Sequence, residues 1–195
     1  MKALTAAEVE GSTTMVLAKL DPPAATGQQA TTATMHTLNL GDSVYMLLRP
    51  QIKEDKATVL KKCFRSSEQL DEFYESPYQC GLRFKFEDLE HEVAPNDHEV
   101  QHNDIVVMAT DGVSDNLFDE QIIEECIQPL VTREGDLPRP EDASICISTL
   151  AESVSYSQTV ETPLLKNALA RGLDSHDKIG GRTDDITVIV AQVKL

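Results

Sequence analysis

The segment DIVVMAT, residues 104–110, constrains the fold more than any other stretch of this chain, because it is a nearly continuous apolar run. A strand that is apolar on both faces must be covered on both sides, in a layered structure or in the core of a sandwich. The run ends at Thr110, and Asp111 and Gly112 follow at once. A buried strand therefore delivers a carboxylate to the end of a sheet, where either a turn or a bound metal ion would explain it.

The other predicted elements follow a simple order along the chain. Strand patterns dominate the first part, helical patterns come after the apolar run, and a last strand closes the chain. The predicted strands cover 12–20, 35–40, 43–49, 104–110 and the end of 180–195, and the predicted helices lie within 119–131, 139–157 and 162–173. This order favours the α+β class or a layered sandwich over a regular βαβ winding.

Three local signals refine this outline. Gly41 and Asp42 stand between two apolar runs, which predicts a tight hairpin joining the strands 35–40 and 43–49. Asp119 is a candidate N-cap for the helix that follows it, and an acidic first turn suits the helix dipole. Residues 87–103 are strongly acidic, so we expect a loop there with one short strand at 98–101.

Composition excludes several classes of protein. The chain has 195 residues, which predicts one domain, 1–195, with a substantial core. Its net charge of −16 argues against nucleic acid as a main partner, because phosphate backbones require basic patches. Its apolar runs are all far shorter than the roughly 18 residues that a membrane span needs. The four cysteines lack C-x-x-C spacing, so we expect reduced core thiols rather than a disulfide or zinc framework.

Three aspartates occur in similar settings at predicted strand ends. Asp42 lies between two strands, Asp111 follows a strand, and Asp184 precedes one. Carboxylates that converge at one sheet edge raise one another's pKa unless a cation lies between them. Mg²⁺ and Mn²⁺ accept such oxygens, and two of these ions can lower the pKa of a shared water. Taken singly, each aspartate is also a common turn residue, so spacing alone leaves both interpretations open.

Four motifs together resemble those of the metal-dependent protein phosphatase family, the type 2C serine/threonine phosphatases. They are GST at 11–13, LNLGDS at 38–43, ATDGVSDNL at 109–117 and GGRTDDITVIVA at 180–191. The resemblance covers residues 11–195, nearly the whole chain. The segment FYESPYQCG, at 73–81, is similar to the compact branch of the family found in mitochondria and plastids.

The resemblance implies a fold, an activity and a set of site residues. The fold would be an αββα sandwich of two antiparallel sheets flanked by helices, incomplete at its N-terminal side. The activity would be hydrolysis of phosphoserine or phosphothreonine at a centre of two Mg²⁺ or Mn²⁺ ions. Asp111 and Asp184 match metal ligands, Asp42 matches a residue near a third metal, and Gly112 would allow close approach of the backbone. A phosphoprotein substrate follows from this reading.

The family also has motif residues before GST that this sequence does not match. They are an early aspartate, a phosphate-binding arginine and an Asp-Gly pair whose aspartate bridges the metals. We therefore expect the 195-residue chain alone to be weakly active or inactive. The alternative is a degenerate phosphatase, a pseudophosphatase, that acts as an interaction module with a partner complex covering the sheet edge left open.

The expected location is intracellular. The first residues, MKALTAAEVEG, contain no apolar segment of the kind that a secretory signal requires. Resemblance to the compact branch implies the mitochondrion more specifically, and the alternative is the cytoplasm.

Overall fold

The computed structural model describes residues 11–21, 31–54, 57–70, 76–81, 89, 91–170, 172 and 180–195. By its internal contacts the chain forms two compact units. The first unit comprises Met1–Val44, Ser66–His102 and Leu195, and the second comprises Tyr45–Arg65 and Asn103–Lys194.

The first unit is built from antiparallel strands. A three-stranded sheet has the order β2-β3-β7, where β2 is Met15–Asp21, β3 is Thr32–Leu40 and β7 is Ala94–Gln101. A short pair joins β1, Ser12–Thr13, to β6, Cys80–Gly81. Leu40, Cys80 and Leu89 form a buried apolar cluster in this unit, against which Met15, Tyr78 and Val93 pack.

One face of the three-stranded sheet carries a histidine between two carboxylates. Nδ1 of His36 lies 2.6 Å from Oδ1 of Asp97, and Nε2 lies 3.0 Å from Oδ2 of Asp21. The hydrogen bond to Asp97, with that to Asp21, raises the pKa of His36 above its ordinary value. The pKa of His98 is instead lowered, because this side chain is partly buried away from water. The two histidines therefore differ in pKa although they lie on adjacent strands.

We expect this difference to be visible in an NMR titration of the imidazole signals. His36 should titrate above pH 6.5 and His98 below it. Asp97→Asn should lower both pKa values, and that of His36 more, because His36 loses a hydrogen bond as well as the nearby charge. A raised folded-state pKa means that protonated His36 stabilises the fold fully below its unfolded pKa. That contribution disappears as pH rises through the raised pKa. If the two imidazoles titrate together near pH 6.5, the assignment of both environments is wrong.

The second unit contains a four-stranded sheet with the order β5-β4-β8-β9. Its strands are β4, Val44–Ile52, β5, Thr58–Arg65, β8, Ile105–Ala109, and β9, Val188–Gln192. The apolar run at 104–110 forms β8, which lies between two other strands and is almost entirely buried, as its sequence predicts.

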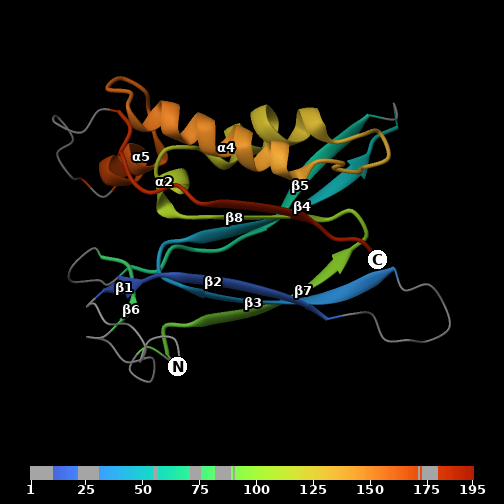
Figure 1. Cartoon of the computed structure of the whole chain (residues 1–195), viewed down its shortest axis with the longest axis horizontal. Helices are drawn as coiled ribbons and strands as arrows, with labels where there is room; N and C mark the ends of the chain where they lie inside the picture. The colour runs from blue at the N-terminus through green and yellow to red at the C-terminus, as the bar shows by residue number, and fades with distance from the viewer. Residues whose placement is uncertain are drawn as a thin grey trace. The chain divides into compact units, whose positions relative to one another are not determined.

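The helices of the second unit follow β8 along the chain. They are α2, Asp111–Ser114, α3, Asp119–Gln121, the π-helix η2, Ile122–Ile127, the 3₁₀ helix η3, Gln128–Leu130, α4, Pro140–Ser155, and α5, Pro163–Ala170. Figure 1 shows α4 running along the four-stranded sheet, and it contacts β9. Its buried residues Ala143, Ile147, Ala151 and Ser155 recur every four positions, so they form one stripe on the helix. Strands and helices are thus largely segregated, which confirms the α+β class.

The hairpin predicted at Gly41 and Asp42 is wrong. The strands β3 and β4 on either side of it belong to different sheets, so they do not pair with each other. Gly41 has a positive φ of 96°, and a Cβ there would lie 2.7 Å from the carbonyl oxygen of Tyr78. The Gly-Asp turn therefore carries the chain out of one sheet and into another, a distinction that depends on distant strands.

Two further local predictions need correction. The acidic segment 87–103 is expected to be a loop with one short strand at 98–101, but the strand β7 is longer, Ala94–Gln101, because it pairs with β3 along its length. Asp119 is not the N-cap of its helix; that position is Phe118, whose N–H donates to Oε1 of Gln121 (3.0 Å). The Asp119 carboxylate instead accepts hydrogen bonds from Lys62 and Arg65, which stand on β5.

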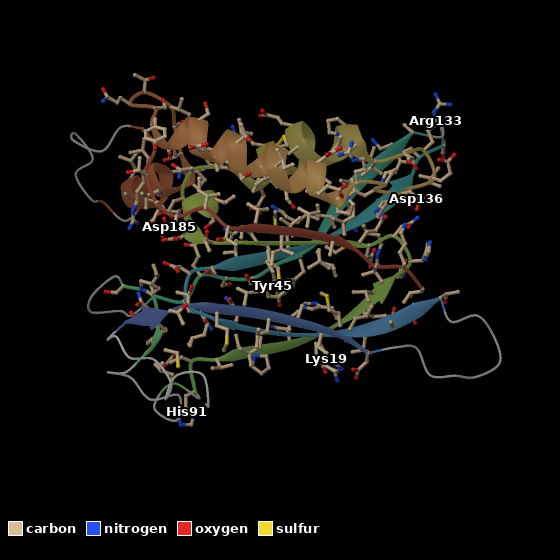
Figure 2. All side chains as sticks on the ribbon, in the orientation of Figure 1. Lys19, Tyr45, His91, Arg133, Asp136 and Asp185 are labelled. Carbon is tan, nitrogen blue, oxygen red and sulfur yellow. A yellow bond between two sulfur atoms is a disulfide. The ribbon has the colours of Figure 1, made fainter. Side chains whose placement is uncertain are left out.

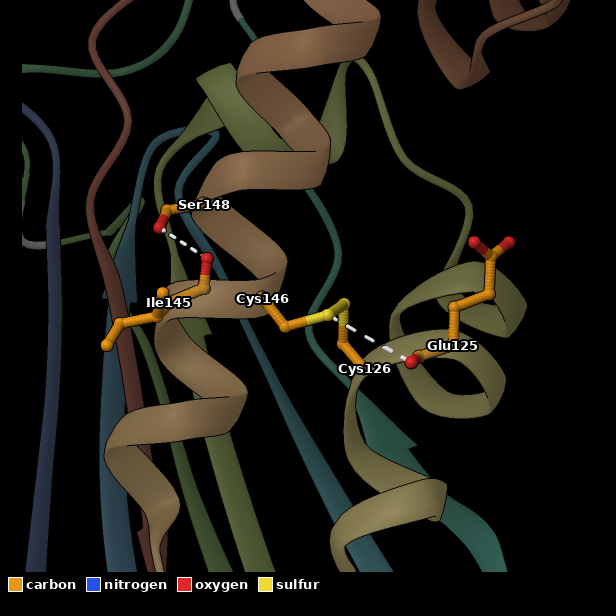
Figure 3. The surroundings of a disulfide bond; sticks show 5 residues. All are labelled: Glu125, Cys126, Ile145, Cys146 and Ser148. Atoms are coloured by element: carbon orange, nitrogen blue, oxygen red, sulfur yellow. Dashed lines mark hydrogen bonds between the residues drawn. A yellow bond between two sulfur atoms is a disulfide. The ribbon is translucent and has the colours of Figure 1, made fainter.

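The prediction of reduced core thiols is wrong for two of the four cysteines. Cys126 on η2 and Cys146 on α4 form a disulfide, with their Cα atoms 5.4 Å apart (Figure 3). Cys63 and Cys80 are free, as predicted, but only Cys80 is buried, because Cys63 is exposed. The lack of C-x-x-C spacing did not reveal the pair, because the two partners are 20 residues apart and meet only when the helices pack.

No helix within the described ranges is long and apolar enough to cross a membrane.

Candidate functional site

Two segments far apart in sequence are joined side by side in the second unit. The N–H of Thr110 donates to the carbonyl of Thr187 (3.1 Å), and the N–H of Thr187 donates to Oγ1 of Thr110 (3.0 Å). The same hydroxyl donates to the carbonyl of Asp185 (3.0 Å). These bonds hold the end of β8 against the segment that leads into β9. They bring together two of the three aspartates singled out from the sequence, Asp111 and Asp184.

Gly112 permits the closest approach of these segments. A Cβ at this position would lie 2.5 Å from the carbonyl oxygen of Asp185, which is too close for any side chain. Figure 2 shows Asp185 at the end of the second unit where α2 begins. The glycine expected to allow close backbone approach does so, but its neighbour here is the backbone of the 184–187 segment. A role for Gly112 at a metal stays a prediction.

A buried asparagine locks the same two segments together. Nδ2 of Asn116 donates to the carbonyl of Gly112 (2.9 Å) and to the carbonyl of Arg182 (2.8 Å). Its Oδ1 accepts a hydrogen bond from the N–H of Arg182 (2.9 Å). The side chain of Asn116 therefore binds both the N–H and the carbonyl of Arg182, as the backbone of a neighbouring strand would. Asn116 is 1% exposed, so water cannot replace these bonds.

The electrostatics of Asp111 show that the two carboxylates interact. Burial raises the pKa of Asp111, and the negative charge of Asp184 raises it further. The positive charge of Arg182 and the N–H of Gly112, which lies 2.9 Å from Oδ1 of Asp111, act in the opposite direction. A carboxylate held partly buried beside another carboxylate favours a bound cation, as argued for converging aspartates above.

Arg182 supplies a positive charge at this place. Its Nη1 lies 3.1 Å from Oδ2 of Asp115, and its Nη2 lies 3.5 Å from Oδ2 of Asp184. Asp115 stands within the motif at 109–117. In the structure it is the C-cap of α2, and its carboxylate takes part in an ion pair across the two segments.

The residues fit a divalent cation in their chemistry, although not as a complete site. Carboxylates are the ligands that Mg²⁺ and Mn²⁺ prefer, and the Arg182 guanidinium already faces two of them. Within the described ranges, however, no three His, Cys, Asp or Glu side chains are grouped so that they could hold a metal ion. Asp111 and Asp184 are thus suited to be part of a ligand set whose remaining members the described residues do not supply.

A polar cavity of about 320 Å³ lies next to Asp184, between α4 and the segment 183–186. Hydroxyl groups and carboxylates dominate its lining. The lining residues are Ser148, Thr149, Glu152, Ser155, Tyr156, Thr183, Asp184, Asp185 and Ile186. Asp184 is therefore accessible to solvent and to a polar ligand on the side facing α4.

Asp42 belongs to the first unit, in the turn after β3. The preceding Gly41 is held by Gln69, whose Oε1 accepts from the N–H of Gly41 (2.8 Å). The N–H of Gln69 in turn donates to the carbonyl of Gly41 (3.0 Å). The turn is thus rigidly positioned within its own unit. A contribution of Asp42 to a site with Asp111 and Asp184 stays a prediction.

Three residues that shape the site were not singled out from the sequence as site residues: Thr110, Asn116 and Arg182. Each stands within a motif that was noticed, at 109–117 or 180–191. Their roles depend on which backbone groups lie opposite them, and no local pattern shows this. Treating the two motifs as partners, and asking which side chains could bridge them, would have pointed to Asn116.

Comparisons with known proteins extend these observations. No protein-family model matches the chain. The chain is 32% identical over 166 residues to "Protein phosphatase PTC7 homolog fig" of Drosophila mojavensis, a match that covers 82% of this chain and 49% of that protein. It is 29% identical over 203 residues to "Probable protein phosphatase 2C 26" of Arabidopsis thaliana, covering 98% of this chain and 58% of that protein.

A solved structure shares the fold. The X-ray structure of the photosystem II phosphatase PBCP matches with a TM-score of 0.73 and 25% identity, over 100% of this chain and 69% of that chain. The present chain spans about half the length of the curated relatives that it matches.

Proposed function

This chain belongs to the metal-dependent protein phosphatase family, the type 2C serine/threonine phosphatases, and we propose that it supplies Asp111 and Asp184 to the metal centre of such an enzyme. The observation that carries this proposal is the pairing of residues 110–116 with 182–187, which places the two carboxylates close enough to repel each other. Two family motifs thereby converge in one unit of the fold.

In this proposal each residue has a defined task. Asp111 and Asp184 bind Mg²⁺ or Mn²⁺, and Gly112 lets the two backbones meet beside them. Asp42 would lie near a further metal, as the resemblance of its motif to the family implies. A divalent ion held there would supply Lewis acidity toward the phosphate ester of a phosphoserine or phosphothreonine. The polar cavity next to Asp184 leaves that side of the site accessible to a phosphoprotein substrate.

We further propose that the chain alone has little or no phosphatase activity. The described residues include no three-ligand group, and the chain spans about half the length of its relatives. Asp111 and Asp184 would then form only part of the centre. Further ligands and a residue that anchors the substrate phosphate would have to come from elsewhere.

Calorimetric titration of the purified chain with Mn²⁺ tests the metal site. We expect measurable binding that Asp111→Asn and Asp184→Asn each weaken at least about tenfold, since each removes a charged ligand. Asp136→Asn serves as the matched control, because Asp136 is a half-exposed carboxylate of the same unit that pairs with Lys194. If Asp136→Asn weakens Mn²⁺ binding equally, the effect comes from the loss of any negative charge and not from the loss of a metal ligand.

Turnover of a phosphopeptide in the presence of Mn²⁺ tests the second statement. We expect activity near background for the 195-residue chain. Strong turnover that Asp111→Asn abolishes would support the phosphatase assignment and overturn the proposed lack of activity.

A second candidate function is that of a non-catalytic module, a pseudophosphatase within a complex. The observation that favours it is the edge strand β2, which pairs with β3 and lies at the end of its sheet. Leu17 and Leu20 on this strand are 54% and 41% exposed. Apolar edge strands attract further strands, so a partner chain could cover this edge. A folded chain that binds no Mn²⁺ would favour this function over the first.

The location inside the cell, and in the mitochondrion in particular, is also a proposal. It is supported by the similarity of residues 73–81 to the compact branch of the family. Fractionation of cells that express the full-length protein from its own gene would test it.

A further inference from the structure

The side chain of Arg182 lies beside Asp184, one of the two proposed metal ligands. Its guanidinium pairs with Asp115 at 3.1 Å and with Asp184 at 3.5 Å. The guanidinium faces Oδ2 of Asp184, so a divalent cation that binds this oxygen must compete with a positive charge already beside it.

The backbone and the side chain of Arg182 are held very differently. Asn116 binds the N–H and the carbonyl of Arg182, so its backbone position is fixed by a buried group. The side chain is 53% exposed and reaches the carboxylates from the solvent side. The guanidinium can therefore leave the carboxylates without disturbing the backbone that carries Asp184.

We propose that the Arg182 guanidinium is the internal counter-ion of Asp115 and Asp184 in the metal-free chain, and that a divalent cation enters by displacing it. This inference rests on the proposed metal site. The new element is that the Arg182 guanidinium competes with the metal ion for the Asp184 carboxylate. In the metal-free state Arg182 offsets the repulsion between carboxylates, and on metal entry it moves out toward solvent while its backbone stays in place.

Calorimetry with Mn²⁺ on Arg182→Gln tests the exchange. Glutamine keeps a polar side chain but removes the charge that must be displaced. Because exposed ion pairs are individually weak, we expect Mn²⁺ affinity to rise about five- to tenfold. The matched control is Arg139→Gln, since Arg139 is also a solvent-exposed arginine of the second unit that pairs with two carboxylates, Glu141 and Asp142. It removes the same formal charge, so its affinity should change by less than about twofold.

Each result of this titration has a definite meaning. Tighter binding by Arg182→Gln alone supports the exchange. Unchanged or weaker binding by Arg182→Gln, with normal binding by the parent chain, overturns the exchange and leaves the metal site standing. Absence of binding in the parent chain and in both variants overturns the metal site and the exchange together. An equal rise in Mn²⁺ affinity in both arginine variants would show that the change in net charge alone causes it, and this overturns the exchange.

An independent readout follows the guanidinium itself. In an NMR titration of the parent chain with Mg²⁺, which is diamagnetic, the side-chain N–H signals of Arg182 should move toward those of a free arginine. The signals of Arg139 should stay in place. Arg182 signals that remain unchanged at saturating Mg²⁺ would contradict displacement, even if calorimetry showed a change in affinity.

Discussion

Replacement of Asn116 by alanine is expected to lower the free energy of unfolding by about 3 kcal/mol and to weaken Mn²⁺ binding as well. The fully buried amide donates to the carbonyls of Gly112 and Arg182 and accepts from the N–H of Arg182. Alanine removes three hydrogen bonds, each of which contributes about 0.5–1.5 kcal/mol, and it leaves the carbonyl of the buried Gly112 without this partner. The variant also loses the hydrogen bonds by which Asn116 joins the backbone next to Asp184 to the backbone next to Asp111.

Urea denaturation and Mn²⁺ calorimetry of the same variant measure both effects. Asn39→Ala is the matched control, because Asn39 is also 1% exposed. Its amide donates to the carbonyl of Ser67, and its Oδ1 has no partner among the described residues. We expect that control to cost about 1 kcal/mol, the value of one ordinary hydrogen bond. If Asn116→Ala costs no more than Asn39→Ala, Asn116 does not lock the two segments together.

Loss of the Cys126–Cys146 disulfide should destabilise the chain by about 3 kcal/mol. The crosslink closes a loop over a sequence separation of 20 residues, and a loop of that size restricts the unfolded chain by about this amount. In the folded chain it joins η2 to α4, the helix that contacts β9 and lines the cavity next to Asp184. Reduction should therefore loosen the helical layer beside the candidate site.

The double variant Cys126→Ser/Cys146→Ser compared with the oxidised chain in urea denaturation gives the magnitude. Cys63→Ser is the control, since Cys63 is free and exposed, and its substitution should leave stability unchanged. Thiol counting by mass spectrometry should find two free thiols in the oxidised chain, at Cys63 and Cys80. Four reactive thiols without reductant would show that the disulfide does not form in solution.

The regular elements were largely predictable, because their signals are local. The apolar run at 104–110 became the buried strand β8, and the helical periodicity of 139–157 became α4, Pro140–Ser155. The errors occurred where a distant partner decides the outcome. The Gly41–Asp42 turn has the composition of a hairpin but connects two different sheets. The acidic segment 94–101 has a polar sequence but becomes a strand because β3 pairs with it.

The candidate site divides in the same way. Asp111 and Asp184 could be singled out from motifs, and hydrogen bonds in the structure join the segments that carry them. The residues that bring them together, Thr110 and Asn116, act through hydrogen bonds to backbone groups 66–77 positions away. A single side chain in the sequence carries no sign of which carbonyl it will meet.

The sequence by itself determined the order of strands and helices, the α+β class and the family, because these depend on periodicity and on motifs read along the chain. Only the tertiary structure decided which sheet each strand joins, which cysteines pair, and that Arg182 faces Asp115 and Asp184. The physical reason is that hydrogen bonds, ion pairs and disulfides act over a few ångströms. Residues far apart in sequence meet at that distance only after the strands and helices have packed.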